Sequence, residues 1–525
     1  MRPSPIALGA ALPFLVGAAL RLWNLPAQIL GGDEVHALRA AVNFPLPRIL
    51  VTYQLADNCI PLTALYKLFM LGGLPMTELT FRLPVLLCGL AALLALPAAF
   101  AGRLDGRAVL VYRWLIAISP ALVFYSRIAR SYMPMVLLTF GAAMAFEAWW
   151  RTRSWRPGAA YVVLGALAVW FHLGAGPIVA APFVFAAGEL LARRADLGRG
   201  LRDLIVLGLS LTAAFALFLV PARRSLLALI ASKRKGDQEV LWSDLVPDLF
   251  RLQAGTARIW LVALFCLAAL AGLALLLRRD RRLALFTITV AAGHVSGILI
   301  LSPMGLNNST IFGRYLLPIL PFTLLWVASA FGGPGIARTL GAGLLVLLLA
   351  VGGPFTSPLS WRTSFLHHND FVGFYEPVQT LPAEAVPAFY RRLRGETVIE
   401  HPWAYRWDTN HAFHRYQAAH GGRVKVSSPQ GILFRPPLAL RNVVRPEPEA
   451  LCRSGARYVI VHMNFAREED RMPGARLSDF QIFRGLRRTL RQSSTTVADR
   501  LRRQWGEPVY ADRRVRVWDL QASCR

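Results

Sequence analysis

The feature that most constrains this chain is a series of long, nearly uncharged runs that fills residues 1–352. A helix of about 20 apolar residues spans a bilayer, because a helix satisfies its own backbone hydrogen bonds in lipid. Short arginine-rich breaks separate the runs. The pattern predicts eleven membrane-spanning helices, at about 5–23, 82–101, 108–124, 132–150, 158–172, 174–192, 203–220, 257–277, 283–302, 314–331 and 337–352.

The first run follows Arg2 and shares some features with a signal peptide. No convincing small-residue cleavage site precedes Arg21, and ten more runs follow it, so we interpret the run as a retained anchor.

The basic residues of the short loops predict the orientation. Cytoplasmic loops are enriched in arginine and lysine. If the N-terminus is cytoplasmic, the inside loops hold most of the arginines, whereas the short outside loop around His172 has none. The inside residues are Arg103, Arg107, Arg151, Arg153, Arg156, Arg193, Arg194, Arg199, Arg202, Arg278, Arg279, Arg281, Arg282 and Arg338. Eleven spans then place the C-terminal part of this multi-pass protein outside.

Three outside segments are long enough to have structure: 24–81, 221–256 and the tail 353–525. In the first, the semi-apolar stretch from Ile60 to Leu71 is too short to span, so we predict an interfacial helix. We therefore divide the chain into a transmembrane domain, 1–352, and a soluble domain, 353–525.

The tail is polar and mixed in composition. Residues 396–400 and 456–462 resemble buried strands, 478–492 and 410–419 resemble helices, and 509–510 with 515–518 suggest a closing hairpin. This pattern predicts a small α/β domain. The tail has 27 basic and 16 acidic residues, a net charge of +11. This charge is compatible with a solvated surface or with attraction to anionic lipid head groups or an anionic glycan.

Composition excludes several protein classes. Five cysteines, 41 glycines and 34 prolines in 525 residues are too few for a disulfide scaffold, collagen or a low-complexity chain. The net charge of +28 does not by itself indicate nucleic-acid binding, because basic residues in a membrane protein also set its orientation. We predict no nucleic-acid partner. No phosphate-binding or dinucleotide-binding glycine motif and no zinc spacing is present. Cys452 and Cys524 could pair in an oxidising compartment.

The strongest candidate for chemistry is Gly-Gly-Asp-Glu-Val-His at 31–36, just past the first span. Neighbouring residues on a helix point about 100° apart, so Asp33 and Glu34 have different tasks. One carboxylate could accept a proton from an acceptor hydroxyl, and the other could hold a metal, hold the acceptor or orient its neighbour. A helix N-cap followed by an acidic first turn explains the pair equally well.

A second candidate is Tyr-Ser-Arg-Ile-Ala-Arg-Ser-Tyr at 125–132. Arg127 and Arg130 are three residues apart, so on a helix they would share one face, where two guanidiniums could clamp a phosphate. Ordinary interfacial anchoring by Arg and Tyr132 is the alternative.

Further candidates are Arg314 and Tyr315 at the start of a late span and Asp57 before the interfacial helix, each of which could instead be a helix-end residue. We interpret His172 as a plain interfacial histidine. All these groups fall on one side of the membrane. Proton-coupled transport would need ionisable groups in mid-span, where His294 is the main candidate.

In order and topology, residues 5–350 resemble the GT-C membrane glycosyltransferases, in particular the bacterial relatives of protein O-mannosyltransferases and lipid A aminoarabinose transferases. The matching features are the Asp33-Glu34 pair after the first span, Pro61-Leu62, Ser-Arg-x-Ala-Arg-x-Tyr at 126–132, Arg-Tyr-Leu-Leu-Pro at 314–318 and an outside soluble domain. The family fold is an α-helical polytopic membrane protein, here with about eleven transmembrane helices and a C-terminal extracytoplasmic α/β domain.

The resemblance implies a hexosyl- or pentosyltransferase that uses a polyprenyl-phosphate sugar on the periplasmic side, with inversion at the anomeric carbon. Asp33 would be the general base assisted by Glu34, and Arg127, Arg130 and Arg314 would bind the donor phosphate. We expect His36, Asp57, Tyr132 and Tyr315 to contact substrates. The acceptor is a hydroxyl of a lipid, glycan or protein. No cofactor is implied, and because family members differ, a divalent metal is left open.

The chain departs from the family at 57–62, where the first proline and the basic group of a common juxtamembrane signature are missing. Two other functions stay open: a transporter or flippase for a lipid-linked saccharide, and a non-catalytic assembly factor. A transporter should show internal repeats, and we find none that is convincing. An assembly factor should tolerate any change of Asp33.

Overall fold

The computed structural model describes residues 5–23, 25, 34, 37, 40–41, 44–53, 59–74, 78–193, 197–233, 242–301, 309–352, 387–393, 396–401, 425–427, 451–452, 456–463 and 482–524. Asp33, His36, Asp57 and the helix predicted at 410–419 lie outside these residues.

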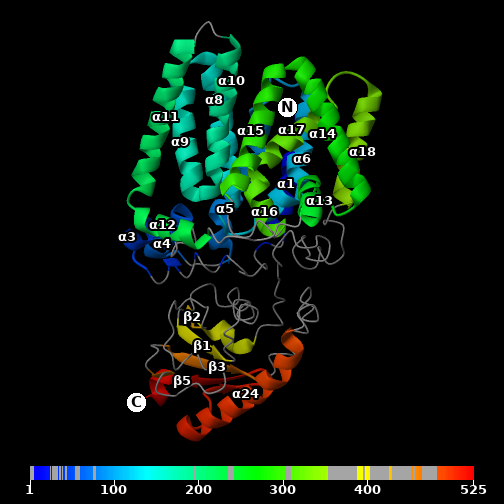
Figure 1. Ribbon diagram of the computed structural model, residues 1–525. Coiled ribbons are helices and arrows are strands. Elements are labelled where there is room, and N and C mark those ends of the chain that lie inside the picture. Colours follow the sequence, from blue (N-terminus) through cyan, green and yellow to red (C-terminus); the bar gives the residue numbers. More distant parts are fainter. Residues whose placement is uncertain are drawn as a thin grey trace.

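Residues 5–352 form a bundle of long helices (Figure 1). Each predicted span coincides with a helix or a broken helix. The elements are α1 (Pro5–Leu22), α5 (Glu78–Ala98), α6 (Gly106–Ile118), α7 (Pro120–Tyr125), α8 (Tyr132–Thr152), α9 (Trp155–Phe171), α10 (Gly176–Arg193), α11 (Leu197–Leu219), α14 (Ile259–Arg279), α15 (Arg281–Leu301), α16 (Ser309–Leu316), α17 (Leu320–Ser329) and α18 (Ile336–Gly352).

Within the described residues, seven segments are long and apolar enough to cross a membrane by length and composition. They are Leu79–Ala98, Tyr132–Thr152, Leu173–Ala192, Leu197–Leu219, Ile259–Arg279, Arg281–Leu301 and Phe312–Ser329. The other predicted spans correspond to α1, α6 with α7, α9 and α18. Many large apolar side chains on these helices point outward: Leu217 is 74% exposed and Ile300 is 83% exposed. Lipid contact explains such a surface, which water would penalise.

Ion pairs tie the helices together at the end of the bundle that the arginine pattern assigns to the cytoplasm. Arg103 contacts Glu147 at 2.9 Å and Asp280 at 2.8 Å. Arg282 contacts Glu189 at 3.4 Å. Glu147 and Glu189 are therefore partners of loop arginines and not isolated mid-span carboxylates.

Short helices cover the opposite end. The helix predicted from Ile60 to Leu71 is present as α4 (Ile60–Leu71), and its interfacial position stays a prediction. It packs with α3 (Leu46–Leu50) and α12 (Arg223–Lys233) around Ile49, Tyr53 and Ile60. The helix α13 (Trp242–Ala254) lies at the same end (Figure 1).

Two prolines break the helices that lead into this end. The α6 helix stops before Ser119, whose backbone is extended, and Pro120 starts α7, because proline suits a first helical turn but not a helix interior. Pro318 likewise lies in a short 3-10 turn, η3 (Leu317–Ile319), between α16 and α17. Both breaks fall directly beside the arginine motifs.

The tail contains a five-stranded sheet in the order β2-β1-β3-β5-β4. Its strands are β1 (Thr397–His401), β2 (Lys425–Ser427), β3 (Tyr458–His462), β4 (Tyr510–Ala511) and β5 (Val515–Asp519), preceded by the 3-10 turn η7 (Ala388–Arg392). β1 is parallel to β2 and β3, and the predicted hairpin is confirmed as antiparallel β4 and β5. One face of the sheet packs on α24 (Ile482–Trp505) through Val459, Leu501 and Trp518.

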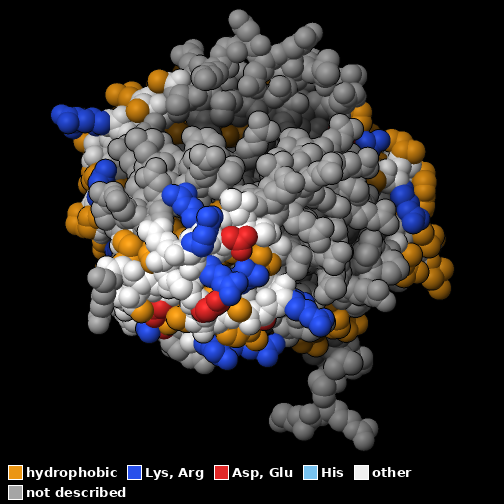
Figure 2. Space-filling model, turned by 90° about the horizontal axis from the view of Figure 1, so that it is seen from below, with side chains coloured by type: hydrophobic (Ala, Val, Ile, Leu, Met, Phe, Trp, Pro, Cys, Tyr) orange, Lys and Arg blue, Asp and Glu red, His pale blue; other side chains and the backbone are white. Residues whose placement is uncertain are grey.

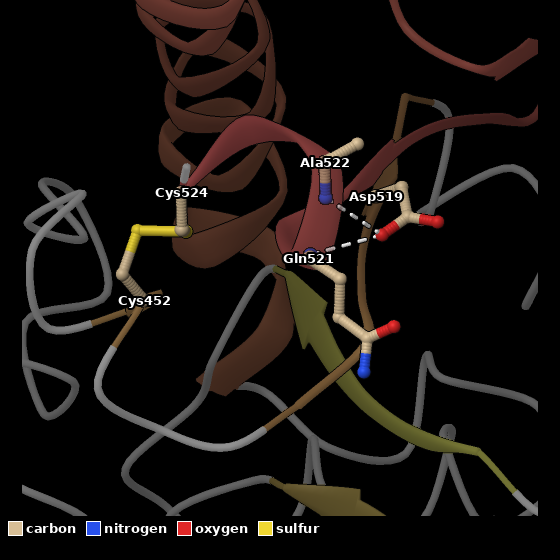
Figure 3. The surroundings of a disulfide bond; sticks show 5 residues. All are labelled: Cys452, Asp519, Gln521, Ala522 and Cys524. Carbon is tan, nitrogen blue, oxygen red and sulfur yellow. Dashed lines mark hydrogen bonds between the residues drawn. A yellow bond between two sulfur atoms is a disulfide. The ribbon is translucent and has the colours of Figure 1, made fainter.

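A disulfide closes this region: Cys452 is bonded to Cys524 beside the short helix α25 (Leu520–Ser523), which Asp519 caps (Figure 3). Basic and acidic side chains lie side by side on the described surface of the tail (Figure 2). Arg502 pairs with Glu507, and Arg516 lies 3.9 Å from Asp499. These pairs favour the solvated-surface interpretation for this part of the tail.

Candidate functional site

The first part of the site is a buried ion pair between Glu34 and Arg82. The guanidinium of Arg82, near the start of α5, donates to both carboxylate oxygens of Glu34, at 2.9 Å from Nε and 2.7 Å from Nη2. The Oε1 atom also accepts the backbone N–H of Ala129 at 2.7 Å. Glu34 is 1% exposed and Arg82 is fully buried. One carboxylate thus joins three segments that are far apart in the sequence.

A buried charge of this kind depends on its partner. Removing one member of a buried pair leaves an uncompensated charge and costs about 3–5 kcal/mol. Tyr66 of α4 stacks on Phe81, the residue before Arg82, with ring centroids 3.9 Å apart. The helix α4 therefore packs against the turn of α5 that carries Arg82.

Arg127 holds the end of α1. It is 1% exposed, and its Nη1 atom donates to the carbonyls of Leu20 at 3.0 Å, Arg21 at 3.1 Å and Trp23 at 2.7 Å. The last carbonyls of a helix have no partner within the helix and carry partial negative charge, so a guanidinium satisfies them well.

Arg21 does the same for the end of α6. It is fully buried and donates to the carbonyls of Ile116 and Ala117, each at 3.3 Å, and to Ser126 Oγ at 3.2 Å. The ends of α1 and α6 are thus fixed by each other's neighbouring arginines, which positions the chain that carries the arginine motif.

The second part of the site is a cluster of aromatic rings and cations, which we call the aromatic–cation cluster. It consists of Tyr125, Arg130, Tyr132, His172, Arg314 and Tyr315. The guanidinium carbons of Arg130 and Arg314 each lie 5.9 Å from the centroid of the Tyr132 ring. Two cations from distant motifs therefore approach one tyrosine.

Rings and backbone contacts hold the cluster in shape. The Tyr132 ring lies 5.0 Å from Tyr125 and 5.4 Å from His172, and His172 lies 5.8 Å from Tyr315. His294 of α15 is fully buried, and its Nε2 lies 2.7 Å from the backbone carbonyl oxygen of Tyr315 at the end of α16. The mid-span histidine thus anchors the Arg-Tyr motif.

The two parts meet in the motif at 125–132, where Ala129 bonds to Glu34 and the next residue, Arg130, joins the cluster. Of the residues predicted for the site, the structure brings Glu34, Arg130, Tyr132, Arg314 and Tyr315 to one end of the bundle. Arg127 is at the same end, but its guanidinium is bonded to α1. Asp33, His36 and Asp57 lie outside the described residues.

Sequence reasoning missed Arg82 and did not predict the aromatic neighbours of His172. A signal for Arg82 existed: it is the one basic residue of the apolar helix α5 and lies at its outer end, where positive-inside bias makes arginine unexpected. His172 gave no comparable signal, because only the tertiary fold places it between Tyr132 and Tyr315.

Among the residues that the structure describes, no group of three or more His, Cys, Asp or Glu side chains is arranged to hold a metal ion. This says nothing of Asp33, His36 or Asp57, so metal use stays open.

No protein-family model and no characterised protein sequence matches the chain. The crystal structure of ArnT from Cupriavidus metallidurans in the apo state is similar, with a TM-score of 0.53 and 13% identity over 98% of both chains. Arabinofuranosyltransferase AftD from Mycobacteria matches 87% of this chain at 18% identity, but at a TM-score of 0.47 no argument rests on it. The chain spans 36% of that protein.

The ArnT match covers the helix bundle and the tail together, and it is too distant in sequence to show more than architecture. The chain thus shares the fold of ArnT, which confirms the predicted fold class of an α-helical polytopic membrane protein with a small C-terminal α/β region.

Proposed function

We propose that the chain is an integral-membrane glycosyltransferase that moves a sugar from a polyprenyl-phosphate donor to an acceptor hydroxyl on the periplasmic side of a bacterial inner membrane. The observation that carries the proposal is the approach of Arg130 and Arg314 to one ring, Tyr132, at the end of a GT-C fold where Glu34 anchors the motif. The shared fold and the sequence resemblance support the reaction class.

The two guanidiniums suit the leaving group. When the bond between the anomeric carbon and the phosphate oxygen breaks, polyprenyl phosphate departs with one more negative charge than the diester had. Fixed cations offset this charge as it develops, and they need no reorganisation in the transition state. We assign Arg130 and Arg314 this role. We assign Arg127 to positioning, because α1 already occupies its guanidinium.

Asp33 is the proposed general base. The acceptor oxygen attacks the anomeric carbon while its proton passes to the Asp33 carboxylate, and attack opposite to the leaving phosphate inverts the centre. Asp33 precedes Glu34 in the chain, and Glu34 is clamped by Arg82 and Ala129. We propose that this clamp orients the segment that carries the base, and that Glu34 assists Asp33 through this positioning.

The tail is the proposed acceptor-docking domain. Its disulfide suits an oxidising compartment, which is the predicted location of the active end of the bundle.

The test is release of polyprenyl phosphate from pentosyl and hexosyl polyprenyl-phosphate donors by the purified chain, with acceptor extracts. Loss of a general base lowers rates by about 100-fold to 10,000-fold, so we expect Asp33→Asn to fall in this range. The matched control is Asp248→Asn in α13. Asp248 pairs with Arg251 at 3.0 Å, and we expect its variant to release polyprenyl phosphate at the rate of the unchanged chain. Absence of release with every donor would contradict the transferase. Equal rates for Asp33→Asn and the unchanged chain would remove Asp33 as the base.

A further inference from the structure

We propose that His172 is a ligand-binding residue of the aromatic–cation cluster, where its Nε2 N–H donates a hydrogen bond to an oxygen of the lipid-linked phosphate. The inference rests on the proposed function, since it adds one contact to the proposed donor site.

The local backbone fixes the tautomer of His172. α9 ends at Phe171, and His172 has an extended backbone before the 3-10 turn η2 (Leu173–Ala175). Its Nδ1 accepts the backbone N–H of Gly174 at 3.1 Å. An accepting Nδ1 carries no proton, so the neutral ring has its proton on Nε2, and Nε2 is a hydrogen-bond donor.

The donor edge of the ring is available to a ligand. Among the described residues, no group accepts a hydrogen bond from Nε2, and this atom is not one of the buried polar atoms that lack a partner. The side chain is half-buried and held between Tyr132 and Tyr315. The imidazole is thus fixed in orientation without being sealed from solvent.

Charge decides which ligand group the N–H faces. The guanidinium carbons of Arg130 and Arg314 each lie 5.9 Å from the centroid of the Tyr132 ring, which itself lies 5.4 Å from the His172 ring. Cations nearby disfavour a protonated imidazole and attract an anion. A phosphate that both guanidiniums hold would find in His172 a third, neutral donor. A sugar hydroxyl is the competing acceptor, and the two cations favour the phosphate.

Gly174 supplies a way to move the ring without changing it. A Cβ at Gly174 would lie 2.9 Å from His172 Nδ1 and 3.1 Å from Tyr315 Cδ1. Gly174→Ala must therefore shift His172 or Tyr315, although its backbone conformation is open to any residue.

The test measures binding of undecaprenyl phosphate, and of undecaprenol as the phosphate-free control, to the full chain in nanodiscs by calorimetry. Loss of one hydrogen bond to a charged group corresponds to a change of about 10-fold in affinity. We expect His172→Phe and Gly174→Ala each to lower the affinity for undecaprenyl phosphate by about 10-fold. His172→Gln keeps a side-chain donor and should lower this affinity by less than about 3-fold. Affinity for undecaprenol should not change in any variant.

Two results would overturn the proposal. Equal weakening of both lipids by His172→Phe would mean that the ring only packs. If His172→Phe leaves the affinity for undecaprenyl phosphate unchanged but raises the KM for the sugar donor, His172 contacts the sugar and not the phosphate. Failure of the proposed function is separable: binding with the expected pattern but no turnover would contradict the transferase and leave this binding site intact.

Discussion

At the scale of single residues, Glu34 decides how the site is assembled. Its two oxygens take three hydrogen bonds, from Arg82 and from the backbone of Ala129. Because the carboxylate is buried, water cannot replace these donors. Removing one of them would leave a buried charge without a partner, which would destabilise the folded chain. We therefore propose different roles for the two adjacent carboxylates: Glu34 positions the segment, and Asp33 acts as the general base.

Arg82→Met should lower the free energy of unfolding by about 3–5 kcal/mol, because it leaves the Glu34 carboxylate buried without its guanidinium. Adding Glu34→Leu to Arg82→Met should recover part of that loss but no transfer activity. Thermal unfolding of the purified protein and donor turnover measure the two effects. Arg338→Met, which removes a contact to the Gly332 carbonyl at the other end of the bundle, is the control. An unchanged Tm in Arg82→Met would refute the role of the pair.

His401 makes the tail sensitive to acid. The side chain is fully buried in β1, and burial, with a smaller effect of His462, lowers its pKa from 6.5 to about 3. Below pH 6.5 the unfolded chain binds a proton that the folded chain does not, so stability falls as the pH decreases from 6.5 towards 3. Hydrogen exchange of peptides from β3 and β5 in the full chain should rise at pH 5 relative to pH 7.5, after correction for intrinsic rates. His401→Phe should reduce this rise, and an identical rise in the variant would contradict the assignment.

The local sequence could predict which residue types gather at this end, but not which task each performs. The expectation that Arg127 and Arg130 share a helix face is wrong, because residues 126–131 lie between α7 and α8. Arg127 donates to carbonyls at the end of α1, whereas Arg130 lies near the Tyr132 ring. The role of His172 depends on rings from α8 and α16, and no local pattern indicates such a contact.

At the scale of elements, the broken helix at 309–329 places the third cation. Pro318 cannot continue a regular helix, so α16 ends at Leu316 and the chain turns through η3 into α17. The break exposes the Tyr315 carbonyl to His294. Arg314 is thereby held in the last turn of α16, near Tyr132.

Pro318→Ala should let α16 continue further as a regular helix before the chain reaches Pro321 at the start of α17, which would turn Arg314 away from Tyr132. We expect affinity for undecaprenyl phosphate to fall by about 10-fold, the equivalent of one charged contact, without loss of thermal stability. Pro182→Ala inside α10 is the control, since that proline lies in a helix outside the cluster. Equal affinities for Pro318→Ala and the unchanged chain would exclude this role of the break.

The sequence could predict the strongly patterned elements of the tail and not their limits. Residues 396–400 and 456–462 were expected as strands and correspond to β1 and β3. β2 has only three residues in a polar stretch and gave no signal. The predicted helix at 478–492 corresponds to α24, which continues to Trp505 because Val497, Ala498 and Leu501 are buried against the sheet. Packing there outweighs the poor helix propensity of the Ser-Ser-Thr-Thr run.

At the scale of the whole molecule, the proposal depends on which compartment the active end faces. The arginine pattern and the disulfide between Cys452 and Cys524 are two separate reasons to propose that this end faces the periplasm. The division at residue 352 into two domains stays a prediction.

The disulfide gives a direct test of that compartment. In chain isolated from bacterial membranes after thiol blocking, Cys452 and Cys524 should become reactive only after reduction. Cys59, Cys88 and Cys266 should react on unfolding alone. Mass spectrometry of the labelled peptides distinguishes the two sets. Labelling of Cys452 and Cys524 without reductant would place the tail in a reducing compartment.

The central claim is that Arg130 and Arg314 bind one phosphate, and a double-mutant cycle on undecaprenyl phosphate affinity tests it most directly. Arg130→Met and Arg314→Met should each weaken binding by at least about 10-fold. Their effects should not add, because both contact the same group. Undecaprenol affinity should be unchanged in all three variants. Undecaprenyl phosphate affinity that is unchanged in the double variant would contradict the account.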